Sequence, residues 1–68
     1  MLVDKNIELW HGGKIKLLVE DRFIDSGEIF LNFDNGMDSY TESLILDNLL
    51  ELRDKINEII EQCKEIKS

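Results

Sequence analysis

The sequence has no proline, one cysteine, and only eight Lys and Arg residues against fifteen Asp and Glu residues. A single cysteine excludes an internal disulfide, and an unpaired thiol is typical of proteins in the reducing cytosol. The formal net charge of −7 argues against direct binding to nucleic acid or an anionic membrane, because both need cations to contact phosphates. No apolar run is long enough for a membrane span or a signal peptide. We therefore expect a cytoplasmic protein.

Residues with the spacing of a catalytic or metal-binding site are also lacking. His11, the single histidine, falls in a predicted turn with no nucleophile or carboxylate paired to it. The acidic stretch 34–45 departs from a calcium-binding loop, because its glycine comes third and its twelfth residue is isoleucine. Cys63 has no base spaced to activate it. We therefore expect no enzymatic activity, no cofactor and no metal site.

A long amphipathic helix is predicted over residues 43–67. Its apolar residues follow alternating steps of four and three, which places them on one side of a helix. They are Ile45, Leu49, Leu52, Ile56, Ile59, Cys63 and Ile66, with Leu46 and Ile60 beside them. No Gly or Pro interrupts the run, and Ser39, Thr41 and Ser43 are alternative N-terminal caps.

The opposite side of this helix carries an acidic stripe with the same spacing. Its members are Asp47, Glu51, Asp54, Glu58, Glu61 and Glu65. Neighbouring like charges repel, each pair costing roughly 0.2–0.5 kcal/mol in an isolated helix. Lys55 after Glu51, and Lys64 after Glu61, offset part of this repulsion. Two interpretations stay open for the acidic stripe, a simply solvated face or a functional acidic surface.

The first part of the chain, residues 1–42, predicts an antiparallel β-meander of three or four short strands. The stretches 11–13, 25–27 and 34–36 each end in Gly, like three-residue hairpin loops with a left-handed glycine. The three loops would pair Leu9 with Ile15, Val19 with Phe33, and Leu31 with Ser39. The second pairing would turn Asp21 inward, so a bulge near 20–21 or a looser loop over 21–27 is the alternative. A two-residue turn at 35–36 would pair mismatched faces.

Alternation along these strands predicts one apolar and one mixed face. The apolar face, on which the helix is expected to pack, holds Ile7, Leu9, Ile15, Leu17, Val19, Ile29, Leu31, Phe33 and Met37. The outer face carries Trp10, Leu18, Phe30 and Tyr40 among charged and polar residues. These four residues and the acidic stripe form the candidate partner surface.

The predicted fold class is therefore α+β, with an antiparallel β-meander of three to four strands packed on one long C-terminal α-helix. We expect a single small domain over residues 1–68. The helix would be about 37 Å long, whereas six-residue strands span only about 20 Å. Because the sheet is too short to cover the helix, the apolar stripe needs another surface.

The leading functional prediction is a non-enzymatic protein–protein interaction module that forms a homodimer through the helix. Its candidate interface residues are Leu52, Ile56, Ile59, Ile60, Cys63 and Ile66. A basic protein is a further candidate partner on electrostatic grounds. The alternative is an acidic nucleic-acid mimic that inhibits a basic enzyme, as phage-encoded or antitoxin-like small proteins do.

Overall fold

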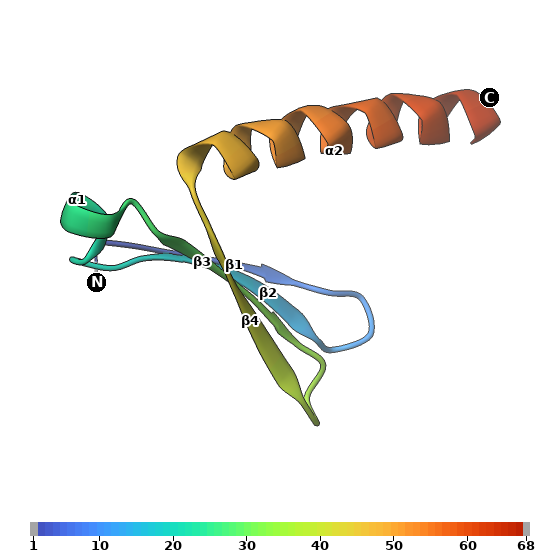
Figure 1. Cartoon of the computed structure of the whole chain (residues 1–68). Coiled ribbons are helices and arrows are strands. Elements are labelled where there is room, and N and C mark those ends of the chain that lie inside the picture. Colours follow the sequence, from blue (N-terminus) through green and yellow to red (C-terminus); the bar gives the residue numbers. More distant parts are fainter. Residues whose placement is uncertain (1, 68) are drawn as a thin grey trace.

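The computed structural model describes residues 2–67. Its elements, in chain order, are β1 (Val3–Glu8), β2 (Lys14–Val19), α1 (Phe23–Ser26), β3 (Ile29–Asp34), β4 (Ser39–Leu44) and α2 (Leu46–Lys67). The four strands form one antiparallel sheet in the order β1-β2-β3-β4, and α2 continues from the end of β4 (Figure 1). The predicted α+β fold, a β-meander followed by a long helix, is confirmed.

The strand register gives the sheet one apolar face. Ile7 lies opposite Ile15, which lies opposite Phe33, so these three side chains point to the same side. The apolar sheet face holds Val3, Ile7, Ile15, Leu17, Val19, Ile29, Leu31, Phe33, Tyr40 and Leu44, with Lys5 and Glu42 among them. The reverse face carries Leu18 and Phe30 among Asp, Asn, Lys, Ser and Thr residues. The predicted facing of these residues in the first three strands is confirmed.

The loop between β1 and β2 has the predicted form but a different position. The Leu9 N–H donates to the Gly13 carbonyl over 2.8 Å, and the Gly12 N–H donates to the Leu9 carbonyl over 3.0 Å. The loop is therefore 10–12, and Gly12, with φ 101°, is its left-handed residue. The strand pairing moves by two residues from the predicted one, which leaves every side chain on its predicted face.

The connection between β2 and β3 contains the short helix α1 instead of a tight hairpin. Gly27 ends this helix with φ 73°, and its N–H donates to the Phe23 carbonyl over 2.9 Å. The predicted pairing of Val19 with Phe33 is wrong, since Ile15 lies opposite Phe33. The alternative of a looser loop over 21–27 agrees with the structure, and the shift of four residues again preserves the faces.

The turn between β3 and β4 is built by two side chains. Asp34 Oδ1 accepts the Gly36 N–H over 2.8 Å. Asn35 Oδ1 accepts the N–H groups of Met37 and Asp38 over 2.8 and 2.7 Å. Asn35 also donates its N–H to the Asp38 carbonyl over 3.1 Å, which closes the turn around residues 36–37. The predicted three-residue loop 34–36 is therefore wrong.

This turn changes which face Tyr40 occupies. Phe33 lies opposite Tyr40, and Leu31 lies opposite Glu42 rather than Ser39, a shift of three residues from the predicted register. An odd shift exchanges the two faces of a strand. Tyr40 is thus on the apolar sheet face, and its predicted place on the outer face is wrong. Met37, predicted for the apolar face, lies exposed in the turn.

Helix α2 begins later than predicted because β4 is longer than predicted. The predicted caps Ser39, Thr41 and Ser43 all lie in β4, so that prediction is wrong. The Ile45 N–H instead donates to Asn48 Oδ1 over 3.2 Å, which satisfies an amide at the helix start. Asp47, in the first turn, places a carboxylate near the positive end of the helix dipole.

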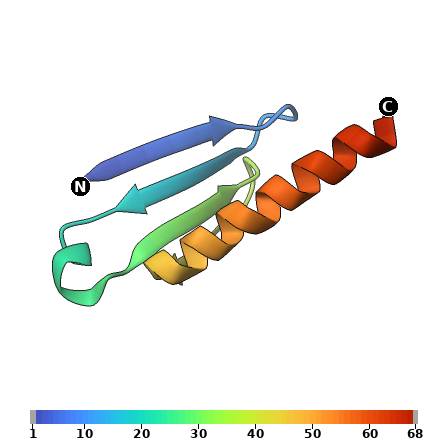
Figure 2. The ribbon, with the colours of Figure 1, turned by 90° about the horizontal axis from the view of Figure 1, so that it is seen from above.

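Sheet and helix together form a wedge, the space between the apolar sheet face and α2. From its first turns α2 rises away from the sheet, and its last turns extend beyond it (Figures 1 and 2). Among residues 2–67, Ile29 is the one buried hydrophobic side chain, at 3% exposure. No residue of α2 is buried, and Leu49 is its one half-buried residue. The expected packing of helix on sheet is thus limited to the first turns of α2.

Candidate interaction surface

The apolar stripe of α2 is exposed from Leu52 to its C-terminal end. Ile59 is 58% exposed and Ile66 is 82% exposed. The six predicted interface residues, Leu52, Ile56, Ile59, Ile60, Cys63 and Ile66, are all exposed, and Cys63 is a free thiol. Leucine and isoleucine at this spacing are typical of a helix face that packs against another surface. Within residues 2–67 the chain does not supply that surface.

A groove lies between α2 and the sheet, at the closed end of the wedge. It has a volume of about 320 Å³ and is lined by Leu31 and Leu44 of the apolar sheet face and by Asn48, Glu51, Leu52 and Lys55 of α2. We call it the α2 groove. Its wall is apolar where the two elements face each other, and the Lys55 Nζ pairs with Glu58 at 3.6 Å on its rim.

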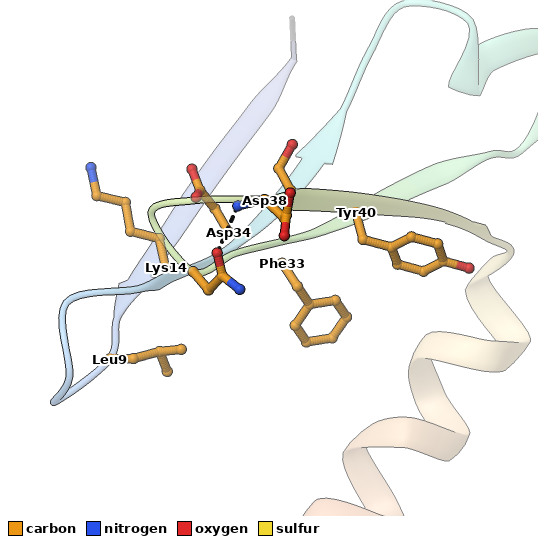
Figure 3. A pocket seen from close by; sticks show the side chains of 8 residues that line it. Leu9, Lys14, Phe33, Asp34, Asp38 and Tyr40 are labelled. Atoms are coloured by element: carbon orange, nitrogen blue, oxygen red, sulfur yellow. Dashed lines mark hydrogen bonds between the residues drawn. The ribbon is translucent and has the colours of Figure 1, made fainter.

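A second hollow lies at the hairpin ends of the sheet. This tip bay has a volume of about 380 Å³ and is lined by Leu9, Lys14, Phe33, Asp34, Asn35, Asp38, Ser39 and Tyr40. The rings of Phe33 and Tyr40 point to the same side of the sheet (Figure 3). The Tyr40 hydroxyl donates to a Glu42 carboxylate oxygen. Polar turn residues therefore frame an exposed aromatic pair.

Glycine permits the close contact beside the tip bay. Gly13 is buried, and a Cβ at this position would lie 2.7 Å from the Asp34 carbonyl oxygen. The β1–β2 loop therefore approaches the end of β3 more closely than any other residue type would allow. From the sequence alone, nothing distinguishes Gly12, which supplies the left-handed turn residue, from Gly13, which permits the close approach.

The predicted outer-face surface is not assembled as one patch. Trp10 lies in the β1–β2 loop, 96% exposed, with its ring edge-to-face with His11 at 5.4 Å between centroids. Leu18 and Phe30 are half-buried on the reverse face of the sheet. The Arg22 guanidinium lies 5.5 Å above the centroid of the Phe30 ring. With Tyr40 on the other face, the four residues do not share a surface.

The acidic stripe is exposed at all six positions, Asp47, Glu51, Asp54, Glu58, Glu61 and Glu65. Three of these carboxylates have a cation beside them. Asp54 pairs with Arg53 at 3.1 Å, Lys55 pairs with Glu58 instead of the predicted Glu51, and Glu61 pairs with Lys64 at 3.5 Å. The predicted pairing of Glu61 with Lys64 is confirmed. The stripe is therefore a row of carboxylates with cations interleaved.

The described part of the chain assembles no cluster of three or more metal-ligating side chains. Over residues 2–67 no helix combines the length and apolar character needed to cross a bilayer. No protein-family model matches the chain, and comparisons with curated proteins and with solved structures give no match either. The physical properties of the surface are therefore the basis for a functional proposal.

The chain exposes more surface than a compact monomer of its mass. The solvent-accessible surface is 5694 Å², whereas a compact monomer of 8.0 kDa would expose about 4,450 Å². The radius of gyration is 14.2 Å, against about 11 Å for a compact chain of this length. The excess of roughly 1,200 Å² exceeds the ~800 Å² that each partner buries in a standard stable interface. The chain therefore carries enough uncovered surface for a full interface.

Proposed function

We propose that this chain is a cytoplasmic, non-enzymatic protein–protein interaction module that works as a homodimer through α2. The observation that carries the proposal is the apolar stripe of α2, exposed from Leu52 to Ile66 beside a sheet face that is only partly covered. A small chain in which residues 2–67 fully bury one hydrophobic side chain gains too little from burial to offset its conformational entropy. A partner surface supplies the missing burial.

A second copy is the partner that the surface fits best. Both apolar surfaces, the α2 stripe and the apolar sheet face, belong to the same chain, so a two-fold axis covers both in each copy. Apart from Glu51, which also lines the α2 groove, the acidic stripe lies on the far side of α2, away from the apolar residues. Basic residues that flank the apolar stripe include Arg53, Lys55 and Lys67. The carboxylates therefore stay in solvent when two helices meet, despite a net charge of −7.

The alternative proposal is an acidic mimic that occupies the nucleic-acid channel of a basic enzyme. The six exposed carboxylates on one side of α2 support it. The ion pairs of Asp54, Glu58 and Glu61 with basic neighbours weaken it, because each cation lowers the local negative field. The two proposals differ in salt dependence, since only the mimic relies on charge attraction.

Sedimentation equilibrium of the unmodified chain and of Ile59→Asp tests the homodimer. The unmodified chain is expected to be dimeric at tens of micromolar. Ile59→Asp places a carboxylate in the interface and should raise the dissociation constant by roughly 100-fold or more. Asn57→Asp is the matched control, because it adds the same charge on the solvated side of α2 and should leave the dimer intact. An unmodified chain that is monomeric at high micromolar concentration refutes the homodimer.

A further inference from the structure

We infer that the wedge between α2 and the sheet receives the α2 helix of the second copy, running antiparallel. This rests on the proposed homodimer and goes further by assigning a position and a direction to the partner's helix. The alternatives are a parallel helix pair and a dimer formed on another surface. They give different results in the experiments below.

The apolar stripe of α2 faces the wedge. Leu52 lines the α2 groove opposite Leu31 of the sheet. Ile59 and Ile66 follow Leu52 at intervals of seven residues, so they lie on the same side of the helix. This spacing turns them to the same side as Leu52, and along the later turns α2 has risen away from the sheet (Figure 1). Whatever covers the stripe must therefore enter the wedge.

A parallel pair covers this surface poorly. It would set the first turns of both helices side by side, and because each sheet joins its helix at that end, the two sheets would meet there. Only the last three turns of each helix would then pair freely, and so short a helix pair is marginal in water.

An antiparallel pair brings the free C-terminal half of each helix against the N-terminal half of the other. Matching the four-three spacing in opposite directions pairs Ile56 with the partner's Ile59 and Leu52 with the partner's Cys63. Leu49 then meets the partner's Ile66. This pairing is centred between residues 57 and 58, close to the middle of Leu46–Lys67, so the helices overlap over nearly their full length.

Charges and dipoles agree with this direction. In the antiparallel register Arg53 falls beside the partner's Ile60, and Lys55 falls beside the partner's Gln62, so no like charges meet at the seam. Opposed helix dipoles place the positive start of each helix beside the negative end of the other. The basic residues in the last turn, Lys64 and Lys67, then lie near the partner's first turn, where Asp47 lies.

The test is a disulfide between copies of the full chain. Leu52→Cys with the native Cys63 places two thiols in one antiparallel layer, within the ~4–7 Å between Cα atoms that a disulfide needs. Under mild oxidation most of the Leu52→Cys protein should run at twice the chain mass on a non-reducing gel, with peptides 52 and 63 joined. The unmodified chain, Asp54→Cys and Leu52→Cys/Cys63→Ser should show at most a small fraction of this dimer band.

A second measurement leaves the interface residues other than Cys63 unchanged. In Cys63→Ser/Lys67→Cys, spin labels on residue 67 of the two copies should lie roughly 28 Å apart along the helix axis. A parallel pair would bring these labels to within about 20 Å, given an interaxial distance of 8–10 Å. The label distance decides between parallel and antiparallel helices even if Leu52→Cys fails to fold.

The outcomes separate the inference from the proposed function. Rapid joining of Cys63 to Cys63 in the unmodified chain, or the short label distance, overturns the antiparallel direction and leaves the homodimer standing. A dimer with no disulfide in folded Leu52→Cys overturns the placement of the helix in the wedge. An unmodified chain that is monomeric refutes the homodimer, and the inference with it.

Discussion

The sheet and the long helix are completed in different ways. Every strand of the sheet pairs with a neighbour, and Ile29 is buried within it. Helix α2 satisfies its backbone internally, yet it buries none of its side chains. Most helical stability in proteins comes from packing an apolar face, and α2, with 22 residues, has little such packing. The sheet is thus largely built by the chain itself, whereas α2 depends on another surface.

This difference is sharpest in hydrogen exchange. In monomeric Ile59→Asp, amides in the second half of α2 should exchange at least 100-fold faster than in the dimer, because nothing else holds that segment in helix. Amides of β2 and β3, the two central strands, should keep most of their protection. Mass spectrometry of peptides from both regions measures this. Equal protection of α2 and β3 in the monomer would show that the helix is self-sufficient.

A substitution in the sheet should act on stability with little effect on association. Ile29→Ala removes the buried side chain and should lower the free energy of unfolding by about 2–4 kcal/mol, measured by urea titration at fixed protein concentration. Ile24→Ala is the matched control, because Ile24 is exposed and its loss should cost less than about 0.5 kcal/mol. Equal effects of the two substitutions would show that Ile29 is not the centre of the fold.

The smallest effect is expected on the solvated side of α2. Asp54→Gln/Glu58→Gln removes the repulsion between two carboxylates four residues apart, together with their two exposed ion pairs. The two effects are small and opposite, so the melting temperature should stay the same or rise slightly. Unfolding of this variant would show that the acidic stripe does not face solvent.

The same variant tests the alternative function against a captured basic partner. If the acidic stripe mimics phosphates, the affinity should fall at low salt, and the loss should shrink as salt rises. A well-folded variant that binds as tightly as the parent at low salt excludes the mimic. Affinities are compared by calorimetry at two salt concentrations. Asn57→Asp is the control, because it leaves the carboxylates of Asp54 and Glu58 and their ion pairs unchanged.

The sequence predicted the faces of the sheet where side chains alternate strongly. In β1 to β3 the register was wrong by two or four residues, and both shifts preserve which side Ile15 or Leu31 faces. In β4 the alternation is weak, since Tyr40 and Leu44 stand among polar residues. There the turn decides the register. The turn is closed by two hydrogen bonds to the Asn35 side chain, and it sets a register three residues from the predicted one, an odd shift that exchanges the faces.

The candidate site was predictable where it depends on helix periodicity alone. The four-three spacing from Leu52 to Ile66 identified an apolar stripe, and the structure leaves it uncovered. The tip bay was missed because it needs Tyr40 on the same face as Phe33, which no local pattern specified. The wedge was missed as well, since the angle between helix and sheet is set at Ile45, where a single residue joins β4 to α2.

The one-residue joint at Ile45 makes the orientation of α2 a mechanical property of the chain. With no loop between β4 and α2, the helix cannot swing without breaking the Asn48 contact to the Ile45 N–H or the last pair of β4, Leu44 with Ile29. Where the second copy holds α2 in helix, the helix acts as a lever that transmits torque. We expect a force on the C-terminal turns of α2 to act first on the pair of Leu44 with the buried Ile29, one residue from the joint.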